Sequence, residues 1–433
     1  MACKLLVLSI LEPIAPEPEN SLDEDASTVR NAVVIVIDRL GAGFLGPYGN
    51  TWIDTPAMNQ LASESLLFEY ATADSSDLNL LYRAYWSGVH ALCRTDRPER
   101  SLATLVERGG LRATLLTDEA ALLGHPLAAD FGEQVSLDHD EPTSLAGTIE
   151  ETRFAQLMLA AFEWLADAKE PGLLWLHSKG MNGPWDAPAE IAERFRDEDD
   201  PEAYAEITPP QWKLERSHDP DEVLRVMHAY AAQVCVIDAC LGSLLEAIKA
   251  HELANDTLVL VTSPRGYPLG EHGRIGAGER DLFGETLNVP LLIQRPDHKV
   301  SCMRLESLVQ PPDLYVTLRR WFGGTGPVES ATGHDLLELK EDESSWWRQA
   351  AFAAGNNQRA VRTPAWFLNV DETAERSLYA KPDDRWEANE VADRCGDVAE
   401  HLAALIDEFT DQVNRAERVS LAPLSRELIE GIG

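Results

Sequence analysis

One apolar run, Asn31-Ala-Val-Val-Ile-Val-Ile-Asp38, constrains the fold of this chain more than any other feature. Such a run, rich in Val and Ile and without polar alternation, predicts a strand buried on both faces, as in a parallel sheet covered by helices. Further buried strands are predicted at 111–117, 172–177, 257–262 and 289–293, with helices at 56–68, 102–110, 154–168 and 223–251. This alternation predicts an α/β fold with a mostly parallel central sheet between helices.

A chain of 433 residues is longer than one ordinary domain. Its first segment is acidic and contains several prolines, which is typical of a flexible leader, predicted here over residues 1–30. The α/β domain is expected over residues 31–325. The last part of the chain has shorter elements, Pro/Gly turns and a closing helix at 398–414, so we expect a small C-terminal α+β subdomain over residues 326–433.

Charge and apolar patterning limit the partners of the chain. With 37 basic and 73 acidic residues the net charge is −36, which repels nucleic-acid backbones and anionic lipids. No apolar run approaches 18 residues, so we expect no membrane partner. The apolar run Leu5–Leu11 leads into Glu12 without a small-residue cleavage site, so we expect a cytoplasmic protein, with export left open. A local basic pocket for an anion is compatible with this charge.

The ends of the predicted strands mark the expected site. In open α/β sheets, ligands bind at the carboxyl ends of the strands. Asp38, Asp118, His177 and Ser263 each lie at or directly after such an end. We therefore expect these side chains along one edge of the sheet.

Several segments carry a resemblance to a known family. They are Asn31–Leu40, Leu45–Asn50, Arg83 with Ser87-Gly88, Leu269-Gly-Glu-His-Gly273 and Asn288-Val-Pro-Leu-Leu-Ile293. In this order and spacing they resemble the sulfatases of the alkaline-phosphatase superfamily, from about residue 31 to the end. The resemblance implies an alkaline-phosphatase/sulfatase-like fold and a sulfuric ester hydrolase.

The resemblance also implies a particular chemistry. A family sulfatase uses a formylglycine made from Cys or Ser in a C/S-x-P-x-R motif. Its calcium ion is held by adjacent carboxylates after the first strand and by an Asp-His or Asp-Asn pair after a later strand. Lys and His side chains bind the sulfate and protonate the leaving group. Together these groups neutralise an anionic centre, supply a nucleophile and donate a proton.

This chain departs from the motif at most of those positions. Asp38 keeps the first carboxylate, but the second position is Arg39. Counting four residues back from Arg83 puts Asn79 at the nucleophile position, and an amide is not converted to formylglycine. The later metal pair reads Pro264-Arg265. Asp38 is therefore only a remnant of a calcium site, because Arg offers no oxygen ligand.

The other candidates are cations and polar groups near the same strand ends. Arg83 matches the motif arginine, and His177 and Lys179 follow a buried strand where an anion would bind. Arg39, Asn182, Arg265 and Arg280 are the expected pocket residues, Arg280 lying near the family's late lysine. The arginines serve either as an anion pocket or as internal partners of Asp38.

Two function classes remain from the sequence. The first is a sulfatase-like pseudoenzyme without a cofactor, which binds a sulfate- or phosphate-bearing small molecule or a protein partner. The second is an active sulfate- or phosphate-ester hydrolase with an unorthodox site, which would need calcium. An inactive subunit beside an active sulfatase is a third arrangement that the sequence leaves open.

Overall fold

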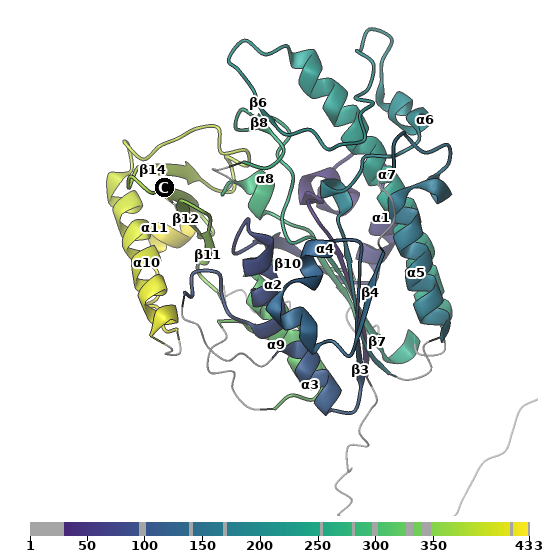
Figure 1. The fold of residues 1–433 in the computed structure, drawn as a ribbon. Coiled ribbons are helices and arrows are strands. Elements are labelled where there is room, and N and C mark those ends of the chain that lie inside the picture. Colours follow the sequence, from purple (N-terminus) through teal and green to yellow (C-terminus); the bar gives the residue numbers. More distant parts are fainter. Residues whose placement is uncertain are drawn as a thin grey trace, which may run out of the picture.

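The computed structural model describes residues 30–94, 101–137, 142–167, 171–251, 254–278, 282–296, 302–325, 332–338, 348–415 and 419–431. The expected leader lies outside these residues except for its last position, and Arg280 also lies outside them. The chain forms a large mixed α/β body with a second, antiparallel sheet beside it (Figure 1).

The large sheet has eight strands in the order β10-β2-β9-β7-β1-β5-β3-β4. In chain order these are β1 (Asn31–Ile37), β2 (Leu66–Ala71), β3 (Arg112–Thr117), β4 (Glu133–Ser136), β5 (Gly172–Ser178), β7 (Thr257–Thr262), β9 (Leu291–Gln294) and β10 (Met303–Val309). Only β9 runs antiparallel to its neighbours in this sheet. The prediction of a mostly parallel central sheet is confirmed.

Burial of β1 explains its composition. Val33, Ile35 and Ile37 pack into the core on one face of the sheet, and Val34 and Val36 pack into the core on the other. A strand with helices on both faces has no solvent side, so neither set of alternate positions is polar.

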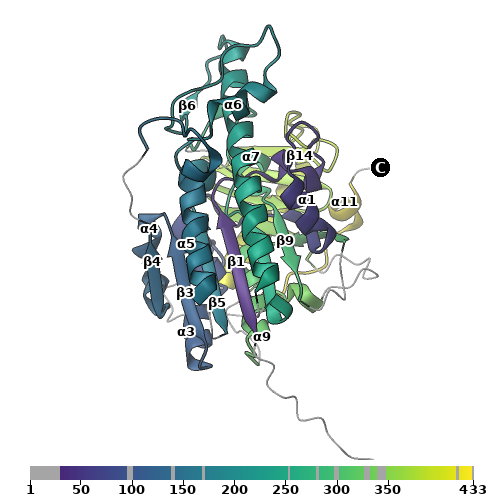
Figure 2. The same ribbon diagram turned by 90° about the vertical axis from the view of Figure 1, so that its right-hand side faces the viewer.

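Helices cover both faces of the large sheet. One layer contains α1 (Pro56–Ser63), α5 (Arg153–Asp167) and α7 (Pro220–Ala250), which lie in front of the sheet in Figure 2. The other contains α2 (Leu78–Ser87), α3 (Leu102–Arg108) and α9 (Pro311–Trp321). By length and composition α7 passes the test for a membrane-spanning helix, but 61% of its most apolar window is buried within the protein. We interpret α7 as a core helix.

The second sheet lies in the C-terminal part. It contains β11 (Ala351–Ala354), β12 (Gln358–Arg362), β13 (Trp366–Asp371) and β14 (Arg376–Ala380), all antiparallel and in sequence order. Helix α10 (Gly396–Asn414) packs on it through a separate apolar core. The expected α+β character of this region is confirmed.

Besides several 3-10 helices, the described chain has further short helices and strands. They are α4 (Ala120–Leu123), α6 (Ala189–Ala192), α8 (Gly284–Leu287), α11 (Arg426–Glu430) and the strand pair β6 (Trp212–Lys213) and β8 (Arg274–Ile275).

The helix predicted over 56–68 is wrong in its second half. Helix α1 ends at Ser63, and β2 begins at Leu66. Leu66, Leu67 and Phe68 are buried one after another because β2 lies between β10 and β9 with core on both sides. Tertiary pairing therefore overrides the helical spacing of the apolar residues.

Candidate functional site

Asp38 lies at the carboxyl edge of the large sheet, directly after β1. The parallel pairing of β1 with β5 and β7 brings Asp38 beside the ends of both neighbours. Its backbone N–H donates to the carbonyl of Ser178 (2.9 Å), and its carbonyl accepts from the N–H of Met181 (2.9 Å). Gly180 makes this approach feasible, because a Cβ there would lie 2.6 Å from the Asp38 carbonyl oxygen. The Asp38 side chain is fully buried.

Arg265 binds the Asp38 carboxylate with two parallel hydrogen bonds. Its Nε donates to Oδ1 (3.0 Å) and its Nη2 donates to Oδ2 (2.9 Å). A third bond runs from Nη1 to the carbonyl of Ser76 (2.6 Å). Burial alone would raise the pKa of Asp38, but the Arg265 charge and hydrogen bonds outweigh burial and lower it. The carboxylate is therefore ionised and paired.

Arg39 adds a second cation beside the same carboxylate. Its side chain is buried, and its Nη1 donates to the carbonyl of Gly266 (3.2 Å). Its backbone adopts the left-handed conformation with φ of 60°, which is uncommon for a residue with a side chain. The Arg39 charge also lowers the pKa of Asp38. The structure thus brings together three of the predicted residues: Asp38, Arg39 and Arg265.

His177 lies near Asp38 but deep in the core. The imidazole is fully buried, and its Nδ1 forms a hydrogen bond with the hydroxyl of Tyr82. Burial lowers the pKa of His177 to about 4, partly offset by the Asp38 charge. Its Nε2 has no hydrogen-bond partner among the described residues. At neutral pH His177 is an uncharged core histidine with no exposed surface for a ligand.

Asn79 and Arg83 lie on α2, but they point to different surroundings. The Asn79 side chain is exposed, and its backbone carbonyl faces His125 Nε2 at 3.2 Å. The Arg83 guanidinium donates to the carbonyls of His90 (3.1 Å) and Cys93. Arg83 therefore binds backbone carbonyls rather than Asn79 or Asp38.

Two further predicted residues follow β5. The backbone N–H of Lys179 donates to the carboxylate of Asp118 (2.7 Å), so Asp118, expected at this edge, does lie there. Burial raises the pKa of Asp118 to about 6, although the Lys179 hydrogen bond and charge oppose this rise. Asn182 ends the short 3-10 helix Gly180–Asn182 and is half-buried.

Known proteins match this chain in sequence and in fold. The sulfatase family model matches residues 124–324. The iduronate 2-sulfatase of Homo sapiens is 23% identical over 362 residues, which cover 69% of this chain and 64% of that protein. The multifunctional alkaline phosphatase superfamily protein PehA of Trinickia caryophylli is 29% identical over 135 residues, covering 30% of this chain and 25% of that protein. A phosphonate monoester hydrolase of Agrobacterium radiobacter has the same fold, with a TM-score of 0.72, 17% identity and coverage of 91% of this chain and 100% of that chain.

The chain is sulfatase-like in sequence and in fold. The residues matched by the family model include β4, β5, β7, β9 and β10 of the large sheet, and the solved structure shares the overall fold. The chain spans a quarter of the length of PehA and just under two thirds of the length of the iduronate sulfatase.

The residues around Asp38 do not fit the calcium ion that the sulfatase family implies. A calcium ion takes six to eight oxygen ligands. Both oxygens of Asp38 accept hydrogen bonds from Arg265, and the neighbouring Arg39 is a second cation. Two guanidinium groups repel a divalent cation and offer it no oxygen.

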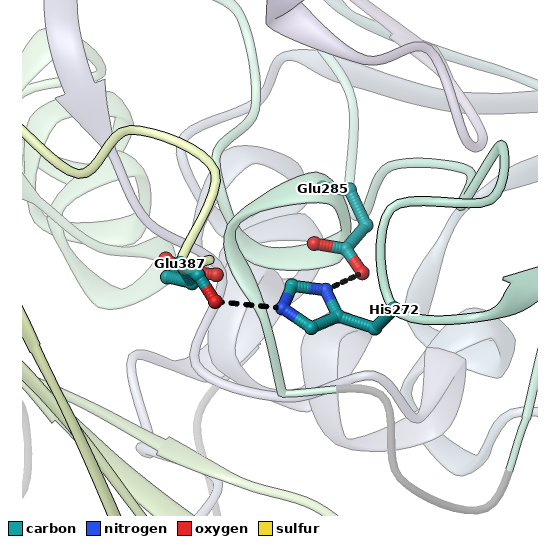
Figure 3. Close-up of side chains that lie close together, drawn as sticks. All are labelled: His272, Glu285 and Glu387. Atoms are coloured by element: carbon teal, nitrogen blue, oxygen red, sulfur yellow. Dashed lines mark hydrogen bonds and ion pairs between the residues drawn. The ribbon is translucent and has the colours of Figure 1, made fainter. Parts of the chain in front are cut away.

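A second cluster of ionisable side chains escaped prediction from the sequence. His272, Glu285 and Glu387 place one ligand-type atom each within 4.8 Å of one another (Figure 3). His272 and Glu285 come from the most sulfatase-like stretch of the chain, which is a usable signal. Glu387 comes from the C-terminal part, more than 100 positions later, and no local pattern marks it. Glu285 and Glu387 also line a cavity of about 280 Å³.

Proposed function

We propose that this sulfatase-like chain is a pseudoenzyme: it does not carry out formylglycine- and calcium-dependent ester hydrolysis and acts as a binding protein. The Arg265–Asp38 ion pair carries the proposal. Arg265 supplies the positive charge beside Asp38 that calcium supplies in the sulfatase family. Its guanidinium donates hydrogen bonds to both oxygens of the Asp38 carboxylate. Because the guanidinium charge is covalently fixed, the chain needs no metal to neutralise this buried carboxylate.

The nucleophile position supports the same proposal. Asn79 presents an exposed carboxamide, which is neither a convertible thiol nor a hydroxyl. Ser75, a buried residue four positions before Asn79, donates its hydroxyl to the carbonyl of Ala354 (2.7 Å) and accepts from the N–H of Asp77 (3.1 Å). Activation of such a hydroxyl requires an adjacent base or metal. Its acceptor here is a peptide carbonyl, which is not a base.

A sulfate- or phosphate-bearing small molecule is the ligand class that we propose. The cavity of about 280 Å³ is lined by Arg362 and Arg385, and guanidinium groups match the geometry of such anions. Trp386 beside them is 55% exposed, an apolar surface on which a ring-containing ligand can stack. Residues of both the large domain and the C-terminal part line this cavity, and Asp38 is not among them.

Calorimetry with calcium tests the loss of the family site. We expect no binding heat at millimolar calcium for the wild-type protein or for Asp38→Asn. Aryl sulfates and aryl phosphates are expected to hydrolyse no faster than in buffer, with or without calcium. Removal of a single electrostatic element typically costs about 10²–10³ in rate, and here several are replaced at once.

Two results would overturn the proposal. One is tight calcium binding that Asp38→Asn abolishes. The other is calcium-dependent turnover of a sulfate or phosphate ester, which would make the chain an active hydrolase with an unorthodox site. Titration with inorganic sulfate and phosphate, compared between wild type and Arg385→Ala, tests the ligand class separately.

A further inference from the structure

The His272–Glu285–Glu387 cluster joins three segments of the chain. His272 lies in the loop between β7 and β8, Glu285 lies on α8, and Glu387 follows β14. Figure 3 shows the imidazole between the two acidic residues. Its Nδ1 lies 2.7 Å from Glu285 Oε1, and its Nε2 lies 3.3 Å from the Glu387 backbone carbonyl. The cluster is distinct from Asp38 and its arginines.

We propose that His272, Glu285 and Glu387 form a binding site for a divalent transition-metal ion such as Zn²⁺. Zinc binds histidine nitrogen and carboxylate oxygen, and its open sites have three protein ligands with solvent in the fourth position. The imidazole favours zinc over calcium and magnesium, which prefer oxygen ligands. Zinc at this cluster would tie Glu387 of the C-terminal part to the large domain.

The groups behind the three side chains already hold them in place. Glu387 Oε2 accepts from the N–H of Gly284 (2.7 Å), and Oε1 pairs with Lys381 Nζ (2.7 Å). The imidazole stacks on Phe283 with ring centroids 3.7 Å apart. Metal sites typically show such supporting contacts, in which ligating carboxylates accept further hydrogen bonds and the second ring nitrogen of the histidine faces a carbonyl.

Lys381 is the group that opposes a metal ion most directly. Its Nζ also donates to the carbonyls of Asp384 (2.7 Å) and Arg385 (3.1 Å), so it is held without Glu387. A carboxylate oxygen has two acceptor positions, and each oxygen of Glu387 keeps one beyond its present bond. Glu69 and Glu271 line the same cavity as Glu285 and Glu387, and its cations are Lys381, Arg362 and Arg385. The four carboxylates outnumber these three cations and leave negative charge for a metal ion.

Binding exchanges a proton for the metal. In the structure Nδ1 of His272 faces a Glu285 carboxylate oxygen and Nε2 faces the Glu387 carbonyl, so we expect a hydrogen on the nitrogen that the ion takes. When the metal binds, the Nδ1–H bond breaks, the nitrogen lone pair coordinates the ion, and the proton leaves to solvent. The cavity beside Glu285 and Glu387 gives the ion and its remaining water ligand a path.

Zinc titration of the metal-stripped, full-length protein tests the site. We expect one zinc ion per chain by calorimetry, with proton release seen as a dependence of the heat on the buffer. His272→Ala, Glu285→Gln and Glu387→Gln are each expected to weaken binding at least about tenfold, the lower end of what loss of even a supporting contact costs. His218→Ala, which removes an exposed histidine, and Asp38→Asn are the matched controls and are expected to bind zinc as the wild type does.

Cobalt gives a second measurement that does not depend on calorimetric heat. Co²⁺ in the wild-type site is expected to give the intense visible absorption of a low-symmetry, four- or five-coordinate ion, which His272→Ala loses. Far-ultraviolet circular dichroism of each variant shows whether it is folded. The proposal is overturned if folded wild type takes up no zinc at millimolar concentration, or if folded His272→Ala binds zinc as tightly as wild type. The controls separate this result from the calcium experiment, since Asp38→Asn leaves the cluster intact.

Discussion

Replacement of Arg265 by alanine is expected to lower the free energy of unfolding by about 3–5 kcal/mol, the usual cost of removing one partner from a buried ion pair. Asp38 has no exposed surface, and the Arg265 side chain is only 12% exposed. The variant leaves an ionised or newly protonated carboxyl group in the core, where Arg39 and the uncharged His177 remain near it. Urea denaturation at pH 7, followed by tryptophan fluorescence, measures the change.

The double variant Asp38→Asn/Arg265→Met distinguishes lost pairing from lost packing. It removes both charges while keeping side chains of similar length, and such replacements are often neutral. We expect it to recover most of the stability lost in Arg265→Ala. Surface substitutions usually change the free energy of unfolding by no more than about 0.5 kcal/mol. If Arg265→Ala changes it by no more than this, the ion pair does not hold the site together.

The sign of the pH dependence gives a further check on this pair. The folded-state pKa of Asp38 is lowered below its ordinary 3.8. The pair therefore stabilises the protein above about pH 4, and this stabilisation is lost as the pH falls through the lowered pKa. The advantage of wild type over Asp38→Asn should shrink on acidification.

The fold and the central part of the site follow from patterns that act over short distances. Buried Val/Ile runs predict parallel strands, and parallel strands bring their carboxyl ends to one edge. That is why Asp38 and Arg265, more than 200 positions apart, were expected together and are bonded to each other. The sequence left open whether the arginines pair internally or bind an external anion. For Arg265, the two bonds to Asp38 favour internal pairing.

Orientation and depth of burial were not predictable in the same way. His177 follows the β5 pattern like a ligand-binding residue, yet Tyr82 and the core enclose it. Arg83 keeps its motif position, but carbonyls in the segment after α2 attract its guanidinium. Both outcomes depend on neighbours that lie elsewhere in the chain. Glu387 is a stronger case, because two of its partners, His272 and Gly284, lie in the domain of the large sheet.

Asp74 is expected to make the folded protein less stable as the pH rises from 4 to 7. It lies between β2 and α2, five residues before Asn79, and is fully buried. Oδ2 accepts from the N–H of Ala91 (3.0 Å), but Oδ1 has no hydrogen-bond partner among the described residues. Burial raises the pKa of Asp74 to about 7, with the Ala91 hydrogen bond and the Arg83 charge opposing the rise.

The expected size of this effect follows from linkage. Between pH 4 and 7 the folded chain keeps the Asp74 proton while the unfolded chain releases it, so stability falls across this window and levels off above it. At about 1.4 kcal/mol per pKa unit, the loss is roughly 2–4 kcal/mol. Asp74→Asn cannot titrate and should not lose this stability. The free energy of unfolding of Asp74→Asn minus that of wild type, measured by urea denaturation, should therefore rise by that amount from pH 4 to pH 8. Asp74→Ala also cannot titrate but lacks the acceptor for Ala91, so it should show the same pH profile at lower overall stability. Parallel profiles for wild type and Asp74→Asn would mean that Asp74 is ionised in the folded protein at pH 4 and above, with solvent or an ion satisfying Oδ1.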